Sequence, residues 1–299
     1  MRKLNQEQLN HLLKYHTKWT QNKVTGQPID LSFTDLSGLD LSHQNLREIN
    51  LEGAILRHCN LSRTNLSLAN LKGTDLSHAL MFRTIIRGAF MDGANLCVAV
   101  GHKVDFSYSS MKRVNMSHVD FRSGKFVGIN FTGSTFENSD LSASDFSKAN
   151  LTKVNGSKAN MSGGMFVKTV FEKSHFDNAD LSESKLRRAN LRESRMTYVN
   201  FAHSDLSYTN FSNASLNGAD LYRTDCRFAN FSYAAMRHVR LQNAYFEKAN
   251  VLHVLADASI NTLPLSSHNG KTLNFILDKL DNFFFVKEDD HQVAINKAR

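Results

Sequence analysis

Every fifth residue from Leu31 to Val251 is apolar, with three exceptions. Of the 45 positions in this series, 42 are Leu, Ile, Met, Phe or Val, and the others are Gly101, Gly156 and Cys226. A period of five matches neither an α-helix, with its period of about 3.6 residues, nor a β-strand, with its period of two. The chain must therefore turn a corner in each unit, and no insertion shifts the frame.

The residues before each central apolar position also follow a pattern. Two residues earlier the side chain is usually small, as at Ala69 or Ser139, and one residue earlier it is usually Asp or Asn. The remaining positions are mostly polar, and Asn, Asp, Ser and Gly favour turns because they bond the local backbone or tolerate unusual dihedral angles. Two inward positions per unit, one large and one small, predict the narrow interior of a solenoid.

This unit resembles that of the pentapeptide-repeat family, A-(D/N)-L-x-x. Segments that match it outright are Ala69-Asn70-Leu71, Ala94-Asn95-Leu96, Ala149-Asn150-Leu151, Ala179-Asp180-Leu181, Ala189-Asn190-Leu191 and Ala219-Asp220-Leu221. The resemblance implies an all-β solenoid, a right-handed quadrilateral β-helix with four units, hence 20 residues, per coil. By that geometry residues 31–255 form about 11 coils, and a coil spacing of ~4.8 Å gives a rod roughly 50 Å long. We expect short α-helical segments at both ends.

Residues 1–30 are expected to form an N-terminal helical cap. The segment from Asn5 to Trp19 has the apolar spacing of an amphipathic helix, and Asn5 is a suitable N-cap. The favoured role is to cover the open first coil, because solenoids must shield their terminal edges. A partner-binding or export segment is the alternative.

Residues 256–299 are expected to form a C-terminal helical cap with a charged tail. The five-residue register fails after Val251, and Lys271 to Phe285 has the apolar pattern of a second amphipathic helix. Capping alone is one interpretation. A homodimer through this helix is the other, because members of the family that this chain resembles often dimerise through their C-terminal ends.

Nothing in the sequence is similar to a signal peptide or a membrane span, because no apolar run approaches ~20 residues. Of the three cysteines, Cys59 and Cys97 are almost two coils apart, about 9 Å, which exceeds the ~7 Å reach of a disulfide. We therefore expect a reduced, cytoplasmic protein. Secretion into a host cell stays open as an alternative, although no signal is visible.

Outward residues 20 apart should stack into columns along the rod. One basic column contains Lys148, Lys168, Arg188, Tyr208, Phe228 and Lys248, and a second contains Arg63, Arg83 and Lys103. Like charges stacked at ~4.8 Å repel only modestly in water, so such columns are either simply solvated or bind an acidic protein surface or phosphates. Lys148, Lys168 and Arg188 are accordingly candidate partner-binding residues.

An acidic column contains Asp120, Asp140, Asn160, Asp180, Asn200 and Asp220. It invites comparison with pentapeptide-repeat proteins that protect DNA gyrase from quinolones or toxins by imitating the charge and width of duplex DNA. Such mimicry needs a strongly negative surface, whereas Asn fills part of this column and residues 31–255 carry 26 basic and 20 acidic side chains. A gyrase or topoisomerase modulator is therefore the alternative function and not the favoured one.

The clearest break in the pattern lies at residues 80–101, where apolar residues occupy outward positions. The candidate partner-binding residues there are Leu80, Phe82, Ile85, Phe90, Val98 and Val100. Exposed apolar clusters on soluble proteins often mark contacts. A local bulge that turns some of them inward, with Val100 filling the slot that Gly101 leaves, is an equally weighted interpretation.

The sequence offers no chemistry of its own. His58, His78 and His118 share a column but lack a carboxylate or thiolate to complete a metal site, and no phosphate-binding loop or C-x-x-C pair occurs. A narrow, filled interior leaves no substrate pocket. We expect no enzyme and no cofactor, but a non-enzymatic rod that binds another protein, with a bacterial effector as one form. Nucleic acid is disfavoured because aromatic interleaving is limited to Tyr208 and Phe228.

Overall fold

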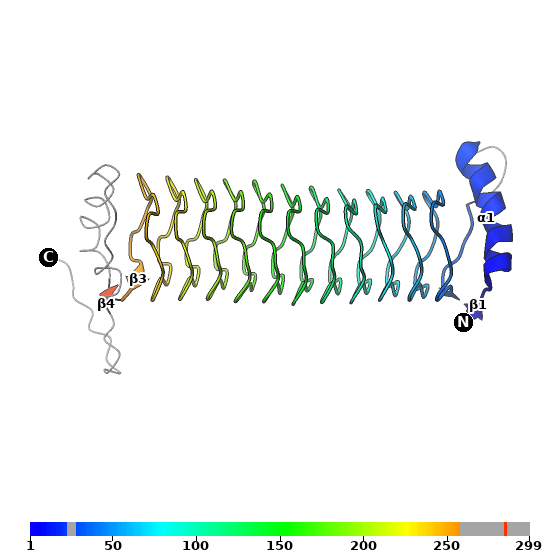
Figure 1. The fold of residues 1–299 in the computed structure, drawn as a ribbon, viewed down its shortest axis with the longest axis horizontal. Helices are drawn as coiled ribbons and strands as arrows, with labels where there is room; N and C mark the ends of the chain where they lie inside the picture. Colours follow the sequence, from blue (N-terminus) through cyan, green and yellow to red (C-terminus); the bar gives the residue numbers. More distant parts are fainter. Residues whose placement is uncertain (23–27, 258–283, 286–299) are drawn as a thin grey trace.

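The computed structural model describes residues 1–22, 28–257 and 284–285. Most of the chain winds into a straight rod of stacked coils (Figure 1). Parallel β-bridges join residues 20 positions apart, from Asp30↔Asn50 at one end to Ala235↔Leu255 at the other, and one bridge occurs in every five-residue unit. A coil therefore consists of 20 residues, and its four units form four sides.

The second residue after each central apolar residue has a left-handed backbone conformation. Every fifth residue from Phe33 to His253 has a positive φ, and most of these are not glycine. Positive φ is unfavourable for residues with a Cβ. The backbone compensates, because the left-handed residue donates its own N–H to the next coil, as Phe33 does to the Glu52 carbonyl at 2.8 Å.

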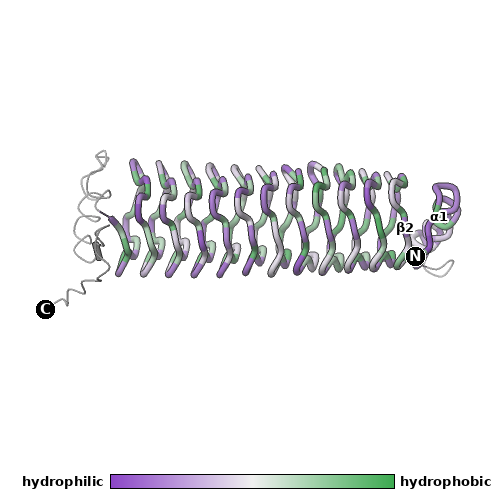
Figure 2. The backbone as a smooth tube through the Cα atoms, turned by 90° about the horizontal axis from the view of Figure 1, so that it is seen from below, coloured by the Kyte–Doolittle hydropathy of each residue, from purple (hydrophilic) through white to green (hydrophobic). Residues whose placement is uncertain are grey.

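The central residues fill the axis of the rod. Phe106, Phe126, Phe146 and Phe166 lie on one side and stack with ring centroids 5.6, 4.5 and 5.4 Å apart. Polar and apolar residues alternate along each coil, so that purple and green bands repeat along the rod (Figure 2). Since each coil contacts mainly its neighbours, stability accumulates coil by coil.

The Asp and Asn residues of the repeat fix each turn locally. The Asp140 Oδ1 atom accepts a hydrogen bond from the Ser142 N–H at 3.0 Å, and Asn150 holds Thr152 in the same way. These Asx-type bonds satisfy backbone groups that the turn leaves free.

The N-terminal segment covers the first coil. Strand β1 (Arg2–Lys3) pairs in parallel with β2 (Thr34–Asp35), and helix α1 (Gln6–Gln21) lies across the open end (Figure 1). Asn5 caps α1 through a reciprocal capping box with Gln8. The Gln6 side chain both donates to and accepts from the Asp40 backbone, which ties α1 to the coil.

The C-terminal end differs from expectation at two points. The register continues beyond Val251, because Val254 and Ala256 are buried in the next inward positions. Strand β3 (Leu255–Ala256) pairs in parallel with β4 (Phe284–Phe285), so the expected helix is wrong at these last two residues. The unpaired backbone edge of a final coil favours the addition of a strand. Phe has a high propensity for β-strands. The rest of the expected helix from Lys271 and its dimer contact lie outside the described residues.

Substitution of Gly156 is predicted to destabilise the protein unless Phe176 is also changed. A Cβ at Gly156 would overlap the Phe176 ring, which occupies the central slot that the glycine leaves. We expect Gly156→Ala to lower the free energy of unfolding by about 1–3 kcal/mol. Chemical denaturation should show that Phe176→Leu removes most of this cost in the double variant. Full stability of Gly156→Ala alone would contradict the packing.

His16 is predicted to make the docking of α1 sensitive to acid. It is fully buried, and its Nδ1 accepts from the Ile29 N–H at 3.4 Å. Burial lowers the pKa of His16, against the raising effects of the Arg47 backbone and the Glu48 charge. The unfolded segment therefore binds the proton more readily, and the stability of the docked helix should be complete above about pH 6.5 and fall below it.

Fluorescence of Trp19, the single tryptophan, measures this because its ring lies 5.5 Å from that of His16. We expect a red shift on acidification that His16→Leu suppresses. The exposed residue His11, on the same helix, supplies the control. His11→Leu should keep the response, and an acid response unchanged in His16→Leu would refute the assignment.

Candidate interaction surface

The interior of the rod is closed by its own side chains. The largest fully buried residues are all Phe, and they lie along the axis. Across the described ranges, no three His, Cys, Asp or Glu side chains gather in a way that could hold a metal ion. The chemistry available to this part of the chain therefore lies on its outer columns.

The basic–aromatic corner is the column formed by Lys148, Lys168, Arg188, Tyr208, Phe228 and Lys248. Each of these residues has a positive φ, so the turn itself projects the side chain outward at a corner of the coil. All six are exposed. Among the residues that the structure describes, Lys148, Lys168 and Arg188 form no ion pair.

Stacking orders the second half of this corner. The rings of Tyr208 and Phe228 are 4.7 Å apart and within 3° of parallel. Arg188 lies 5.7 Å from the Tyr208 centroid, and Lys248 lies 5.3 Å from that of Phe228. Cations over aromatic faces are attracted by the ring quadrupole. Arg188, Tyr208, Phe228 and Lys248 therefore form an aligned series of cations and rings.

The second basic column has the same backbone geometry. Arg63, Arg83 and Lys103 are exposed left-handed residues on another corner, and no ion pair within the described ranges holds them. Ser123 is the next residue of this column, so the column has no aromatic pair beside its cations. This second basic column therefore serves as a control for the basic–aromatic corner.

Other exposed rings have a structural role that the sequence pattern did not reveal. Tyr108 lies over Gly128, and Tyr198 lies over Gly218, the residue at the same corner of the next coil. A Cβ on either glycine would collide with the ring. The available signal was a bulky corner residue 20 positions before a glycine.

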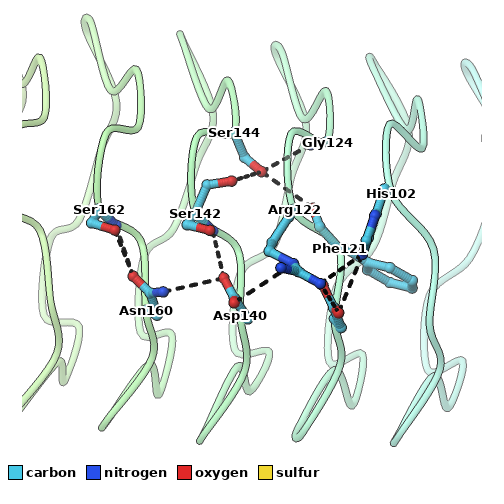
Figure 3. Close-up of polar contacts among 10 residues, drawn as sticks. His102, Phe121, Arg122, Gly124, Asp140, Ser142, Ser144, Asn160 and Ser162 are labelled. Atoms are coloured by element: carbon cyan, nitrogen blue, oxygen red, sulfur yellow. Dashed lines mark hydrogen bonds and ion pairs between the residues drawn. The ribbon is translucent and has the colours of Figure 1, made fainter.

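Neighbouring cations offset part of the charge of the acidic column, as Figure 3 shows around Arg122. Arg122 contacts Asp120 at 2.8 Å and reaches Asp140 at 3.8 Å, and Asn160 donates to Asp140 at 3.3 Å. Burial acts to raise the pKa of Asp120, but hydrogen bonds from Arg122 and His102 outweigh it and hold that pKa below its usual range.

At the far end of the same column, Arg240 pairs with Asp220 at 3.0 Å. Asn160 and Asn200 separate Asp180 from the other carboxylates. The column is thus interrupted by cations and amides along its length.

The apolar residues at 80–101 do not form one patch. Leu80 pairs with Val100, and Phe82 lies beside them on the same side, with Val98 at the preceding corner. Ile85 and Phe90 lie on the next two sides. The interpretation as a bulge is wrong, because the bridges from Asn60 through Leu80 and Val100 to Asp120 are unbroken.

Val100 stays half-exposed and does not fill the slot at Gly101. A Cβ at Gly101 would instead lie 2.6 Å from the Met81 backbone carbon. Leu80 and Phe90 keep 43% and 52% of their surface exposed, so apolar side chains face outward on three sides of this coil. We call those that share the first side, Leu80, Phe82 and Val100, the apolar band.

The histidine column forms a partial ladder. His58 and His78 stack with centroids 4.7 Å apart, and Val98 separates them from His118. Both stacked rings are exposed, and no third metal-ligating group joins them within the described residues.

The five-residue repeat identifies the family of this chain. A family model described as pentapeptide repeats matches overlapping segments that together run from residue 34 to residue 254. The chain belongs to the pentapeptide-repeat family. Membership confirms the expected resemblance and implies a right-handed quadrilateral β-helix, a repeat architecture of scaffold type.

Solved structures of this family are similar to the chain at low sequence identity. Trypsin-treated QnrB1, a plasmid-mediated fluoroquinolone resistance protein, is 16% identical over 62% of this chain and 88% of its own, with a TM-score of 0.49. HetL, involved in heterocyst differentiation regulation in Nostoc sp. strain PCC 7120, is 20% identical over 85% and 97%, with a TM-score of 0.33.

A pentapeptide repeat protein from the Arabidopsis thaliana thylakoid lumen is 15% identical over 48% of this chain and 85% of its own, with a TM-score of 0.27. No curated protein sequence matches the chain significantly. Within the described residues, no helix has the length and apolar character needed to span a bilayer.

The three cysteines are predicted to differ sharply in reactivity. All are free, and burial raises the pKa of Cys59 to about 11 and that of Cys226 to about 12. Cys97 is partly exposed. A colorimetric thiol reagent at pH 8 should therefore modify Cys97 in the native protein and all three cysteines after denaturation, since the thiolate is the reactive form. Rapid native reaction of Cys59 or Cys226 would contradict their placement.

Proposed function

We propose that this protein is a non-enzymatic binding rod that recognises another protein through aligned side chains on its surface. The observation that carries the proposal is the basic–aromatic corner. Its cations Lys148, Lys168 and Arg188 are exposed and unpaired within the described residues, while stacking orders their neighbours. Unpaired cations attract a complementary charged surface, and neighbouring side chains that stacking already holds lose little entropy when a partner binds.

The apolar band is a second candidate contact. Leu80, Phe82 and Val100 lie together on one side and expose apolar surface, and Leu80 and Val100 do so at the position where the repeat otherwise places Asp or Asn. Side chains of this type exclude water from an interface when a partner covers them. A bacterial effector that binds a host or bacterial protein is consistent with either contact.

Gyrase modulation by DNA mimicry has less support. Mimicry requires a continuous negative face, whereas Arg122 and Arg240 pair with the carboxylates of the acidic column. The alternative also predicts a dimer through the C-terminal segment. Most residues of that segment lie outside the described ranges.

The test is affinity capture of partners from bacterial and eukaryotic lysates with purified protein. Three charge- or polarity-reversed variants are compared with the wild type: Lys148→Glu/Lys168→Glu/Arg188→Glu, Leu80→Asp/Phe82→Asp/Val100→Asp, and the control Arg63→Glu/Arg83→Glu/Lys103→Glu. Circular dichroism confirms that each variant remains folded. We expect a protein captured by the wild type and the control and lost from one of the other two variants.

Capture of the same proteins by all four preparations would contradict binding through these surfaces. Capture of gyrase by all four would move the site to the acidic column and favour the alternative function.

A further inference from the structure

The spacing of the basic–aromatic corner constrains the shape of its partner. Tyr208 and Phe228, on successive coils, are 4.7 Å apart, and Phe211 and Phe231 repeat this inside the rod at 4.9 Å. Neighbouring β-strands are separated by ~4.8 Å, so the six side chains of the corner form a line of about 24 Å. A bound segment must present its complementary groups at this interval.

An α-helix matches the interval better than the other linear candidates. Residues three apart on a helix advance about 4.5 Å along its axis, and residues four apart advance about 6 Å. Side chains on one face of an extended strand are about 6.6–6.8 Å apart. Duplex DNA carries one charge per ~1.7 Å of axis, which is far denser than the cations on this corner.

The order of residues along the corner adds a sequence requirement. Three cations, Lys148, Lys168 and Arg188, precede the two stacked rings, and Lys248 follows them. A complementary helix needs acidic residues on successive turns at one end, two apolar residues in the middle and an acidic residue at the far end.

The flanks of the corner carry more cations than carboxylates, which suits an acidic helix. On one flank Asn190 and Asn210 are linked to each other by a side-chain hydrogen bond of 3.3 Å, and on the other flank Ser147 and Ser207 bond Asp145 and Asp205 through their backbone. That second flank also carries Arg187 and Arg227, of which Arg227 pairs with Asp225 at 2.7 Å, and Glu247, directly before Lys248, is its one carboxylate among positions 147–247.

We propose that the basic–aromatic corner binds an acidic amphipathic α-helix of a partner protein, about 16 residues long, lying parallel to the rod. This rests on the proposed function and specifies its partner. The helix places acidic side chains against Lys148, Lys168 and Arg188 and apolar side chains against Tyr208 and Phe228. About 24 Å of contact at ~1.5 Å per residue sets the length.

The experiment uses the full-length protein and a fluorescein-labelled 18-residue helical peptide. The peptide carries Glu at positions 1, 4 and 8, Leu at 11 and 15, and Glu at 18, with Ala, Gln and Lys elsewhere. A scrambled peptide of equal composition distributes the acidic residues around the helix. Fluorescence anisotropy at 50 and 200 mM salt gives the affinities.

We expect the wild type to bind the patterned peptide at least tenfold more tightly than the scrambled one. Lys148→Glu/Lys168→Glu/Arg188→Glu should lose at least tenfold in affinity, and Tyr208→Ser/Phe228→Ser several-fold. The control Arg63→Glu/Arg83→Glu/Lys103→Glu, with the same charge change on a corner without the stacked aromatic pair, should stay within twofold of the wild type.

Equal affinity for both peptides, or equal loss in the control variant, would overturn the proposal because charge alone would explain binding. Tighter binding of a 20-nucleotide single-stranded DNA, lost in the same corner variant, would assign the corner to nucleic acid. If lysate capture depends only on Leu80, Phe82 and Val100 and the peptide does not bind, the helix proposal fails while the proposed function stands.

Discussion

The hydrogen bonds between successive coils are the constraint on which the rest of the structure depends. In each unit the central residue and the left-handed residue both donate to the next coil, as Leu31 does to Asn50 and Phe33 to Glu52. Placing a residue with a Cβ at positive φ costs about 1–2 kcal/mol. The rod accepts this cost at corner after corner because the ladder determines the backbone from both sides.

That ladder also determines where function can lie. Because every coil repeats at 20 residues, the neighbours of an outward side chain in the coils above and below are the residues 20 positions before and after it. Many of the left-handed corner residues are exposed long cations and rings. A partner therefore meets lines of side chains at a fixed interval, and a binding site is a length of one column and its flanks.

Much of this could be predicted from the sequence, because a strict period of five fixes the inward positions and the columns. The cap α1 was predictable from Asn5 and the apolar spacing after it. Partial neutralisation of the acidic column was not, since Arg122 reaches Asp140 across neighbouring columns and coils, and only side-chain conformation determines that contact. The added strands β1 and β4 were also missed, because an open edge can recruit almost any short segment.

The most direct test of the account is a change of register that leaves composition almost intact. Deleting one unit, residues 177–181, should turn everything after it by one side of the rod and separate Lys148 and Lys168 from Arg188 and the stacked rings. Deleting a whole coil, residues 110–129, should leave that corner aligned. The account predicts that both variants fold, by circular dichroism and thermal unfolding, and that the five-residue deletion alone abolishes partner binding. Undiminished binding after the five-residue deletion would contradict recognition by an aligned column.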